Sequence, residues 1–231
     1  MDSSPEGALG SPVSTTPATP PYRTTLHGRL VNIVPLDPAA HGEALYRATH
    51  GERQEDLWRY LSAGPFLRRG EFDDFLRKSA AQEDPLFFSI VEKAANKPVG
   101  LAAYLRITPA HRVIEVGHLL FGPDLQKTAA ATEAMFLIAR HAFEELGYRR
   151  YEWKCNALHV GSRSAALRLG FTFEGIFRQH VIVKGRNRDT AWFSMLDSEW
   201  PARKAAFEKW LDPANFGPDG KQIRSLASLR S

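Results

Sequence analysis

The chain has 231 residues, of which 43% are hydrophobic and 24% are charged, and its formal net charge is +4. This length suffices for one substantial hydrophobic core, so we expect a single domain. The single cysteine, Cys155, excludes an intramolecular disulfide and a multi-cysteine metal site, and the scattered basic residues argue against a specialist in nucleic-acid binding.

The N-terminal segment is rich in Ser, Thr, Pro, Gly and Ala. It has almost no large apolar residues to offset the entropy of ordering it, so we expect residues 1–21 to form a disordered tail. The segment lacks the basic start and apolar run of a secretory signal, and no later run is long enough to cross a bilayer. We therefore expect a cytoplasmic protein without a membrane partner.

Strand and helix patterns alternate through the first half of the chain. Apolar, β-prone runs predict strands at 29–36, 86–92, 99–107 and 113–121. Helical spacing of apolar residues predicts helices at 39–49 and 71–82, separated by an aromatic segment at 52–65.

The second half continues the alternation. A helix is predicted at 130–146, a strand at 151–156, a short helix at 162–169, a hairpin of strands at 173–184 and 189–196, and a helix at 199–211. The order predicts an α/β domain over residues 22–212, followed by a polar tail at 213–231.

The junction at residues 125–134 joins a strand to a helix with almost no side-chain bulk. The first turn of a helix has backbone N–H groups without intrahelical partners and carries partial positive charge, so an anion can bind there. Three consecutive alanines are also good helix formers that need only a tightly packed neighbour. Both interpretations stay open from these residues alone.

Four motifs resemble the GCN5-related N-acetyltransferase (GNAT) superfamily, in particular the branch of the ribosomal-protein alanine acetyltransferases. They are Glu115-Val116-Gly117-His118, the run from Gln126 to Ala131, the run from Ser162 to Phe171, and Phe173-Glu174-Gly175. The resemblance spans residues 28–200. It implies the α/β GNAT fold, in which a mixed, mostly antiparallel sheet of six or seven strands splays open between strands 113–121 and 151–156, with helices on both faces.

The resemblance implies that acetyl coenzyme A lies in this wedge, and no metal is expected. The pantetheine would pair with the backbone of Leu119, Leu120 and Phe121. The pyrophosphate would bind at the helix start, formed by Gln126, Lys127, Thr128, Ala129, Ala130, Ala131 and Thr132. Ala129 replaces a family glycine, which is acceptable in an α-helical conformation and strained at a positive φ.

The chemistry implied is attack of a neutral amine on the thioester, which calls for a proton acceptor. The resemblance places Glu115 and His118 beside the acetyl group. Strand alternation puts the two side chains on opposite faces unless a bulge intervenes. Glu115 could instead brace neighbouring strands, and His118 could be an aromatic filler.

Departure of the coenzyme A thiolate calls for a proton donor. The tyrosine that often has this role is replaced by Ala166, and the resemblance makes Ser162 the candidate; an N-cap is its alternative role. Asn156 is a candidate for a pantetheine hydrogen bond or for capping a turn. His159 stands where the family usually has Asn.

Aromatic residues are candidates for binding the acceptor, although the same residues could be core or dimer contacts. They are His118, Trp58, Phe177 and Trp192. Two functions follow: an N-acetyltransferase acting on a small amine or a protein N-terminus, or a coenzyme-A-binding regulatory module without catalysis. A homodimer is compatible with both, and no nucleic-acid partner is expected.

Overall fold

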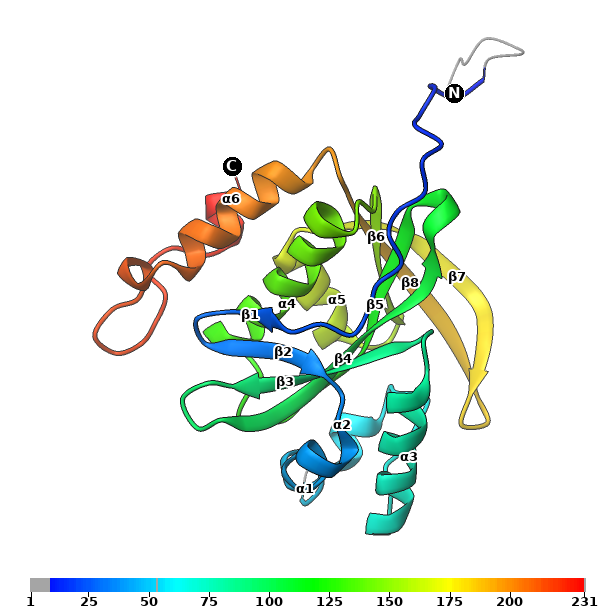
Figure 1. Ribbon diagram of the computed structural model, residues 1–231, viewed down its shortest axis with the longest axis vertical. Helices are drawn as coiled ribbons and strands as arrows, with labels where there is room; N and C mark the ends of the chain where they lie inside the picture. The colour runs from blue at the N-terminus through cyan, green and yellow to red at the C-terminus, as the bar shows by residue number, and fades with distance from the viewer. Residues whose placement is uncertain (1–8, 53, 231) are drawn as a thin grey trace.

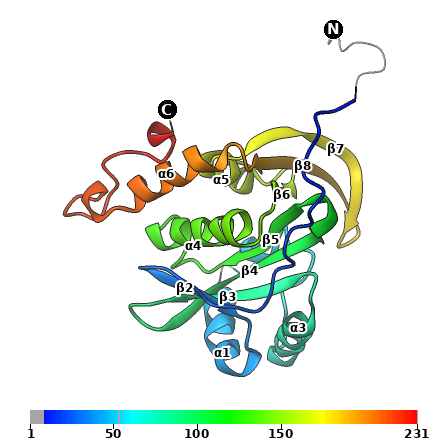
Figure 2. The same cartoon turned by 45° about the horizontal axis from the view of Figure 1, so that its top comes forward.

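Eight β-strands form one mixed sheet in a computed structural model that describes residues 9–52 and 54–230 (Figures 1 and 2). The strands are β1 (Leu26–His27), β2 (Val31–Pro35), β3 (Leu86–Glu92), β4 (Lys97–Thr108), β5 (Val113–Phe121), β6 (Arg150–Asn156), β7 (Thr172–Val183) and β8 (Arg186–Leu196). Their order across the sheet is β1-β2-β3-β4-β5-β6-β8-β7. Among the described strands, only β5 and β6 pair in parallel.

The predicted α/β fold with a mixed, mostly antiparallel sheet is confirmed, but the sheet has eight strands instead of six or seven. The additional strand is β1, whose two residues pair with Ile33 and Asn32 of β2. Two residues are too few to show the alternation by which a strand is predicted from sequence.

Helices cover both faces of the sheet. They are α1 (Pro38–Thr49), α2 (Gln54–Trp58), α3 (Arg69–Ala81), α4 (Ala129–Arg140), α5 (Val160–Leu169) and α6 (Trp200–Leu211). Figure 2 shows α1 and α3 beneath the sheet and α4 and α6 above it. The helix predicted at 130–146 is α-helical to Arg140 and continues as a π-helical turn, His141–Glu145. No described helix has both the length and the apolar character that a membrane span requires.

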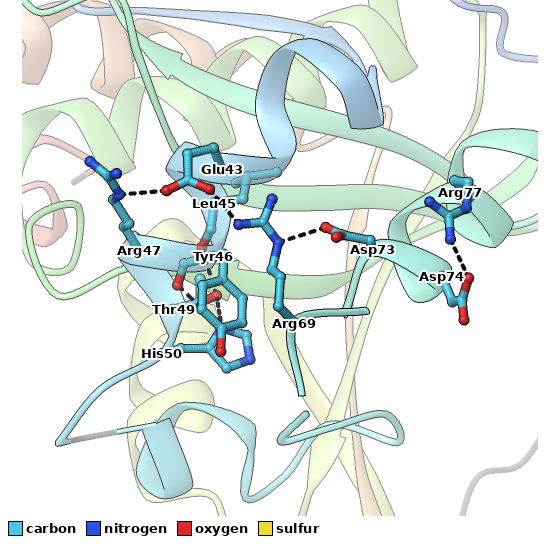
Figure 3. Close-up of polar contacts among 10 residues, drawn as sticks. All are labelled: Glu43, Leu45, Tyr46, Arg47, Thr49, His50, Arg69, Asp73, Asp74 and Arg77. Atoms are coloured by element: carbon cyan, nitrogen blue, oxygen red, sulfur yellow. Dashed lines mark hydrogen bonds and ion pairs between the residues drawn. The ribbon is translucent and has the colours of Figure 1, made fainter. Parts of the chain in front are cut away.

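Aromatic rings and an ion pair join α1 to α3 beneath the sheet, and Figure 3 shows Glu43 and Tyr46 of α1 beside Arg69 of α3. The imidazole of His50 stacks on Tyr46 with ring centroids 4.2 Å apart, and it makes an edge-to-face contact with Phe72 of α3, with centroids 4.9 Å apart. At the surface, the Arg69 guanidinium pairs with Glu43 and lies 5.0 Å above the Tyr46 ring. Because the ion pair is exposed, packing of the rings beneath it contributes more to holding the two helices together.

Both expected tails contain residues that pack on the domain. Ala18 is buried, its amide donates to the Pro109 carbonyl at 3.0 Å, and the amide of Thr19 donates to Leu146 at 2.9 Å. At the other end, Leu226 is buried in the main core. The expected disordered tail up to residue 21 therefore includes residues that pack on the domain. The sequence does not show this, because a few backbone hydrogen bonds can fix an extended segment that lacks any periodic pattern. Residues 1–8 of that tail lie outside the described residues.

Glu133 fastens α4 to the start of β2. Its Oε1 accepts a hydrogen bond from the Arg29 amide at 3.0 Å, and its Oε2 accepts from the amides of Leu30 and Val31 at 2.6 and 2.8 Å. The backbone of Gly28 approaches so closely that an added Cβ would lie 2.5 Å from Oε2. A buried carboxylate with several backbone donors therefore sets the position of the helix that follows β5.

We expect Glu133→Gln to lower the free energy of unfolding by about 2–3 kcal/mol. The glutamine NH2 group replaces one carboxylate oxygen, so a side-chain donor then faces backbone N–H donors. Urea denaturation followed by circular dichroism measures the change. The matched control is Glu208→Gln on the exposed side of α6, which should stay within about 0.5 kcal/mol of the wild type. Equal stability of the Glu133 variant and the control would contradict the anchoring role.

Candidate active site

The backbone pairing of β5 with β6 covers only part of each strand. The register runs from Val113 opposite Arg150 to Val116 opposite Trp153, while β5 continues to Phe121 and β6 to Asn156. The two strands therefore diverge, which confirms the predicted splay of the sheet. The edge of β5 beyond Val116 keeps peptide groups available for an extended ligand.

The start of α4 follows directly from this free edge. Thr128 is the N-cap, and its Oγ1 accepts a hydrogen bond from the Ala131 amide at 3.1 Å. The amides of Ala129 and Ala130 have no hydrogen-bond partner within the described part of the chain. Ala129 is the first helical residue, and the positive φ of this junction, +62°, falls on Lys127 instead. Alanine in place of the family glycine therefore causes no strain here.

Two other predicted side chains of this junction make contacts within the protein. Gln126 Nε2 donates to the Phe121 carbonyl at 2.9 Å and so ties the junction to the end of β5. The buried hydroxyl of Thr132 accepts from Arg168 Nη1 at 3.1 Å, and its amide donates to the Thr128 carbonyl at 3.4 Å. The free donors at the helix start are thus backbone groups that precede Thr132.

A bulge in β5 brings Glu115 and His118 to the same face of the sheet. Gly117 lies opposite Ala103 of β4, whereas Leu120 lies opposite Leu101, so β5 has one extra residue between these pairs. His118 has a positive φ of +48° at this position, and its ring lies 5.0 Å from that of Phe87. The expectation of opposite faces fails at His118, because the extra residue reverses the alternation.

A ladder of alternating charges crosses this face from β4 to β7. Its members, in spatial order, are Arg106, Glu115, Lys154, Glu152, Arg150 and Glu174. Lys154 Nζ lies 3.0 Å from Glu115 Oε2 and 2.6 Å from Glu152 Oε2, and it also lies 3.7 Å from the centroid of the Trp192 ring. Because the Lys154 side chain is only 3% exposed, these contacts are shielded from water.

Burial sets the protonation of the two candidate bases. It raises the pKa of Glu115, although the positive charges of Lys154 and Arg106 offset part of this effect. Burial lowers the pKa of His118, and the nearby positive charge of Arg188 acts in the same direction. At neutral pH, His118 is therefore an uncharged imidazole able to accept a proton.

Ser162 lies in the first turn of α5, on the other side of β6. Its Oγ accepts a hydrogen bond from Trp153 Nε1 at 3.0 Å, which leaves the hydroxyl proton to be donated. The helix begins at Val160 with His159 as its N-cap, so Ser162 is the third helical residue and not the cap. Burial raises the pKa of the neighbouring Cys155 thiol, which argues against a thiolate nucleophile.

Asn156 has the turn-capping contact considered above. Its Oδ1 accepts from the Leu158 amide at 2.9 Å, and its amide nitrogen remains for a ligand. Next to this turn, the His159 imidazole stacks on Tyr60 with centroids 4.3 Å apart, and the Tyr60 hydroxyl donates to the Leu158 carbonyl at 3.4 Å. The chain segment after α2 thus reaches the loop between β6 and α5.

The predicted aromatic contacts divide into two groups. Trp58 is 1% exposed, and its indole N–H donates to the Thr49 carbonyl at 3.1 Å, so it belongs to the packing behind the site and not to its surface. Phe177 is 52% exposed and lies 4.5 Å from Trp192. A hollow of about 640 Å³ adjoins Phe177 and His180 on β7.

Sequence reasoning missed Lys154 and Arg188. The pattern Glu152-x-Lys154 places both side chains on one face of a strand, which was the available signal. The contacts of Lys154 outside its own strand come from β5 and β8, and only the strand order shows that these strands flank β6.

A free strand edge that leads into a helix start with unpaired amides is typical of an acyl-coenzyme-A-dependent transferase. The family model described as "Acetyltransferase (GNAT) domain" matches residues 31–172. The chain belongs to the GNAT family and is an N-acetyltransferase by that membership.

The chain is also similar to solved structures and to a curated relative that are described as acetyltransferases. A GCN5-related N-acetyltransferase from Brucella melitensis is 48% identical, with a TM-score of 0.92 over 93% of this chain and 97% of that one. A probable GNAT acetyltransferase from Chromobacterium violaceum is 40% identical, with a TM-score of 0.78 over 86% of this chain and 100% of that one. The Bacillus subtilis protein named "Putative ribosomal N-acetyltransferase YdaF" is 27% identical over 46% of this chain and 57% of its own length.

We expect Lys154→Met to lower the free energy of unfolding by about 3–5 kcal/mol, because it leaves two buried carboxylates facing each other. Urea denaturation at pH 7 measures this change. The control, Lys97→Met, removes an exposed lysine whose nearest carboxylate, on Asp124, lies 3.9 Å away; its effect should be at most about 1 kcal/mol. A loss no larger than that of the control would show that the ladder does not stabilise the fold.

Proposed function

We propose that the protein transfers the acetyl group of acetyl coenzyme A to a primary amine, carried by a small molecule or a protein N-terminus. The observation that carries this proposal is the free edge of β5 at residues 117–121. This edge includes His118, and the chain leads from it to the unpaired amides at the start of α4. Acetyl coenzyme A, when bound, supplies an activated thioester carbonyl.

The donor would be held mainly by backbone groups. The open edge of β5 at Leu119, Leu120 and Phe121 offers peptide N–H and C=O groups to the amides of a pantetheine arm. The amides of Ala129 and Ala130 point out of the helix start, where the partial positive charge favours a pyrophosphate. Small side chains at these positions let the phosphate oxygens reach the amides.

Glu115 is the proposed proton acceptor for the attacking amine. Its Oε2 is engaged by Arg106 at 2.8 Å and Lys154 at 3.0 Å, so the carboxylate is fixed and its other oxygen remains for the proton. Its raised pKa makes it a stronger base than an ordinary glutamate. His118 is the second candidate, because the bulge turns its neutral ring toward the same face.

Ser162 is the proposed proton donor to the departing thiolate. The Trp153 indole occupies one lone pair of Oγ at 3.0 Å and orients the hydroxyl. A preorganised O–H group can hydrogen-bond the developing negative charge on sulfur as the C–S bond breaks. The backbone amide of Leu119 or Leu120 would stabilise the tetrahedral oxyanion.

A thiol-release assay with acetyl coenzyme A tests the function as a whole. The acceptors are a panel of amines, amino acids and short peptides, and mass spectrometry identifies the N-acetylated product. Turnover on at least one acceptor is expected. Tight binding of coenzyme A without turnover on the complete panel would favour the non-catalytic, regulatory alternative.

We expect Ala130→Glu to weaken binding of coenzyme A by at least about 10-fold, because the carboxylate repels the pyrophosphate and blocks the helix start. Isothermal titration calorimetry measures the dissociation constant. Ala202→Glu, at an exposed position of α6, adds the same charge elsewhere and should leave the affinity unchanged. Unaltered affinity of the Ala130 variant would place the pyrophosphate elsewhere.

We expect Glu115→Gln to reduce kcat by about 100-fold with little change in the KM for acetyl coenzyme A. The pH profile of kcat/KM separates the two candidate bases: loss of its acidic limb in the Glu115 variant assigns the base to Glu115, and loss in His118→Phe assigns it to His118. Circular dichroism controls for folding. An unchanged kcat in both variants would exclude both residues as the base.

A further inference from the structure

Arg188 adds a positive charge that the ladder does not balance. The ladder contains three cations and three carboxylates, and each of its carboxylates pairs with at least one of its cations. Arg188 forms no ion pair and donates no side-chain hydrogen bond among residues 9–52 and 54–230. Its Nε atom is nevertheless buried. An arginine donor that is buried without an acceptor is costly, unless a ligand provides the acceptor.

The position of Arg188 on β8 places it at the open end of the wedge. Asn156, the last residue of β6, lies opposite Thr190 of β8, so Arg188 lies beyond the end of β6. Strand alternation puts Arg188 on the same face as Thr190 and Trp192, and Trp192 is the residue that covers Lys154. This is the face to which the ladder and His118 belong.

A second buried donor on this face also lacks a partner. Trp192 Nε1 is buried and makes no hydrogen bond within the described residues. Between these two donors, Thr190 is already bonded, because its Oγ1 lies 3.0 Å from His180 Nδ1. The face of β8 thus presents two buried N–H donors and no free carboxylate to accept from them.

The neighbouring histidines show the effect of this charge. Burial lowers the pKa values of His118 and His180, and the positive charge of Arg188 contributes to both shifts. Glu115 is the nearby carboxylate of the ladder, but Arg106 and Lys154 already engage it. The site around Arg188 therefore has a net positive potential at neutral pH.

We propose that Arg188 binds a carboxylate of the acceptor, so that the substrate class is an amine bearing a carboxylate; this rests on the proposed function. The planar guanidinium matches a carboxylate in a bidentate arrangement, and the Trp192 N–H provides a further donor on the same face. The same positive charge disfavours an ammonium ion nearby, which promotes the neutral amine that attacks the thioester.

Binding of a product analogue tests the site without requiring turnover. The probes are N-acetyl-L-phenylalanine and its carboxamide, titrated by calorimetry into the protein with coenzyme A present. We expect the acid to bind about 10- to 100-fold more tightly than the amide, and Arg188→Gln to abolish this preference. Arg188→Lys should retain part of it, and Arg186→Gln, at an exposed position of the same strand, should retain all of it.

The proposal is overturned by equal affinity of the wild type for acid and amide, by no binding of the acid, or by an unchanged preference in Arg188→Gln. Weaker binding of coenzyme A in Arg188→Gln with no change for the acid would also overturn it, since Arg188 would then serve the donor. Thermal unfolding of each variant controls for folding. If Arg188→Gln does not fold, Arg188→Lys is compared with the wild type instead. The role of Arg188 is contradicted if these two proteins prefer the acid over the amide equally while Trp192→Phe loses the preference completely.

Turnover separates this proposal from the proposed function. L-phenylalanine and L-phenylalaninamide are compared as acceptors in the thiol-release assay. Selective binding of the acid without turnover on any amine leaves the Arg188 site standing and refutes the transferase proposal. Equal turnover of acid and amide by the wild type confirms the transferase and refutes the Arg188 site.

Discussion

Lys154 resolves a conflict that the sheet itself creates. The parallel register of β5 with β6 sets Glu115 opposite Glu152, and two like charges facing each other across neighbouring strands repel. Lys154 lies within 3.0 Å of both carboxylates and is covered by Trp192, so it converts this repulsion into a bridge. The bridge lies where the backbone hydrogen bonds between β5 and β6 end. It therefore holds the two strands together at the base of the wedge while leaving the rest of the β5 edge free.

The parallel pair of β5 and β6, the only one among the described strands, explains how regular structure leaves a free strand edge beside a helix start. Antiparallel neighbours can stay paired along their full length, but β5 and β6 are connected through α4, whose start must lie beyond the end of β5. Divergence of the two strands exposes peptide groups on the edge of β5, and the chain leads from this edge to the helix start. The same connection thus supplies both an unpaired strand edge and unpaired helix amides. Glu133 keeps the helix in register by binding the backbone at the start of β2.

The helix start and the pattern of strands were predictable because they depend on neighbours in sequence. The alanines at 129–131 and the periodicity after them indicated a low-bulk start of α4, and the structure places Ala129 there in a helical conformation. The bulge at His118 was not predictable, because a single extra residue changes no composition or period. Trp58 was an acceptor candidate by its aromatic character alone, and its burial against α3 depends on contacts with residues far away in the chain.

The sequence by itself determined the order of the elements, the family resemblance and the place of the low-bulk helix start, since each of these is written in local periodicity or in short motifs. The tertiary structure decided which charges meet. Arg106, Glu115, Lys154 and Glu174 come from four strands, and Arg188 reaches the same face from a fifth strand, β8. Electrostatic contacts depend on distance in space, and distances between strands follow from the strand order and register, which no local pattern encodes.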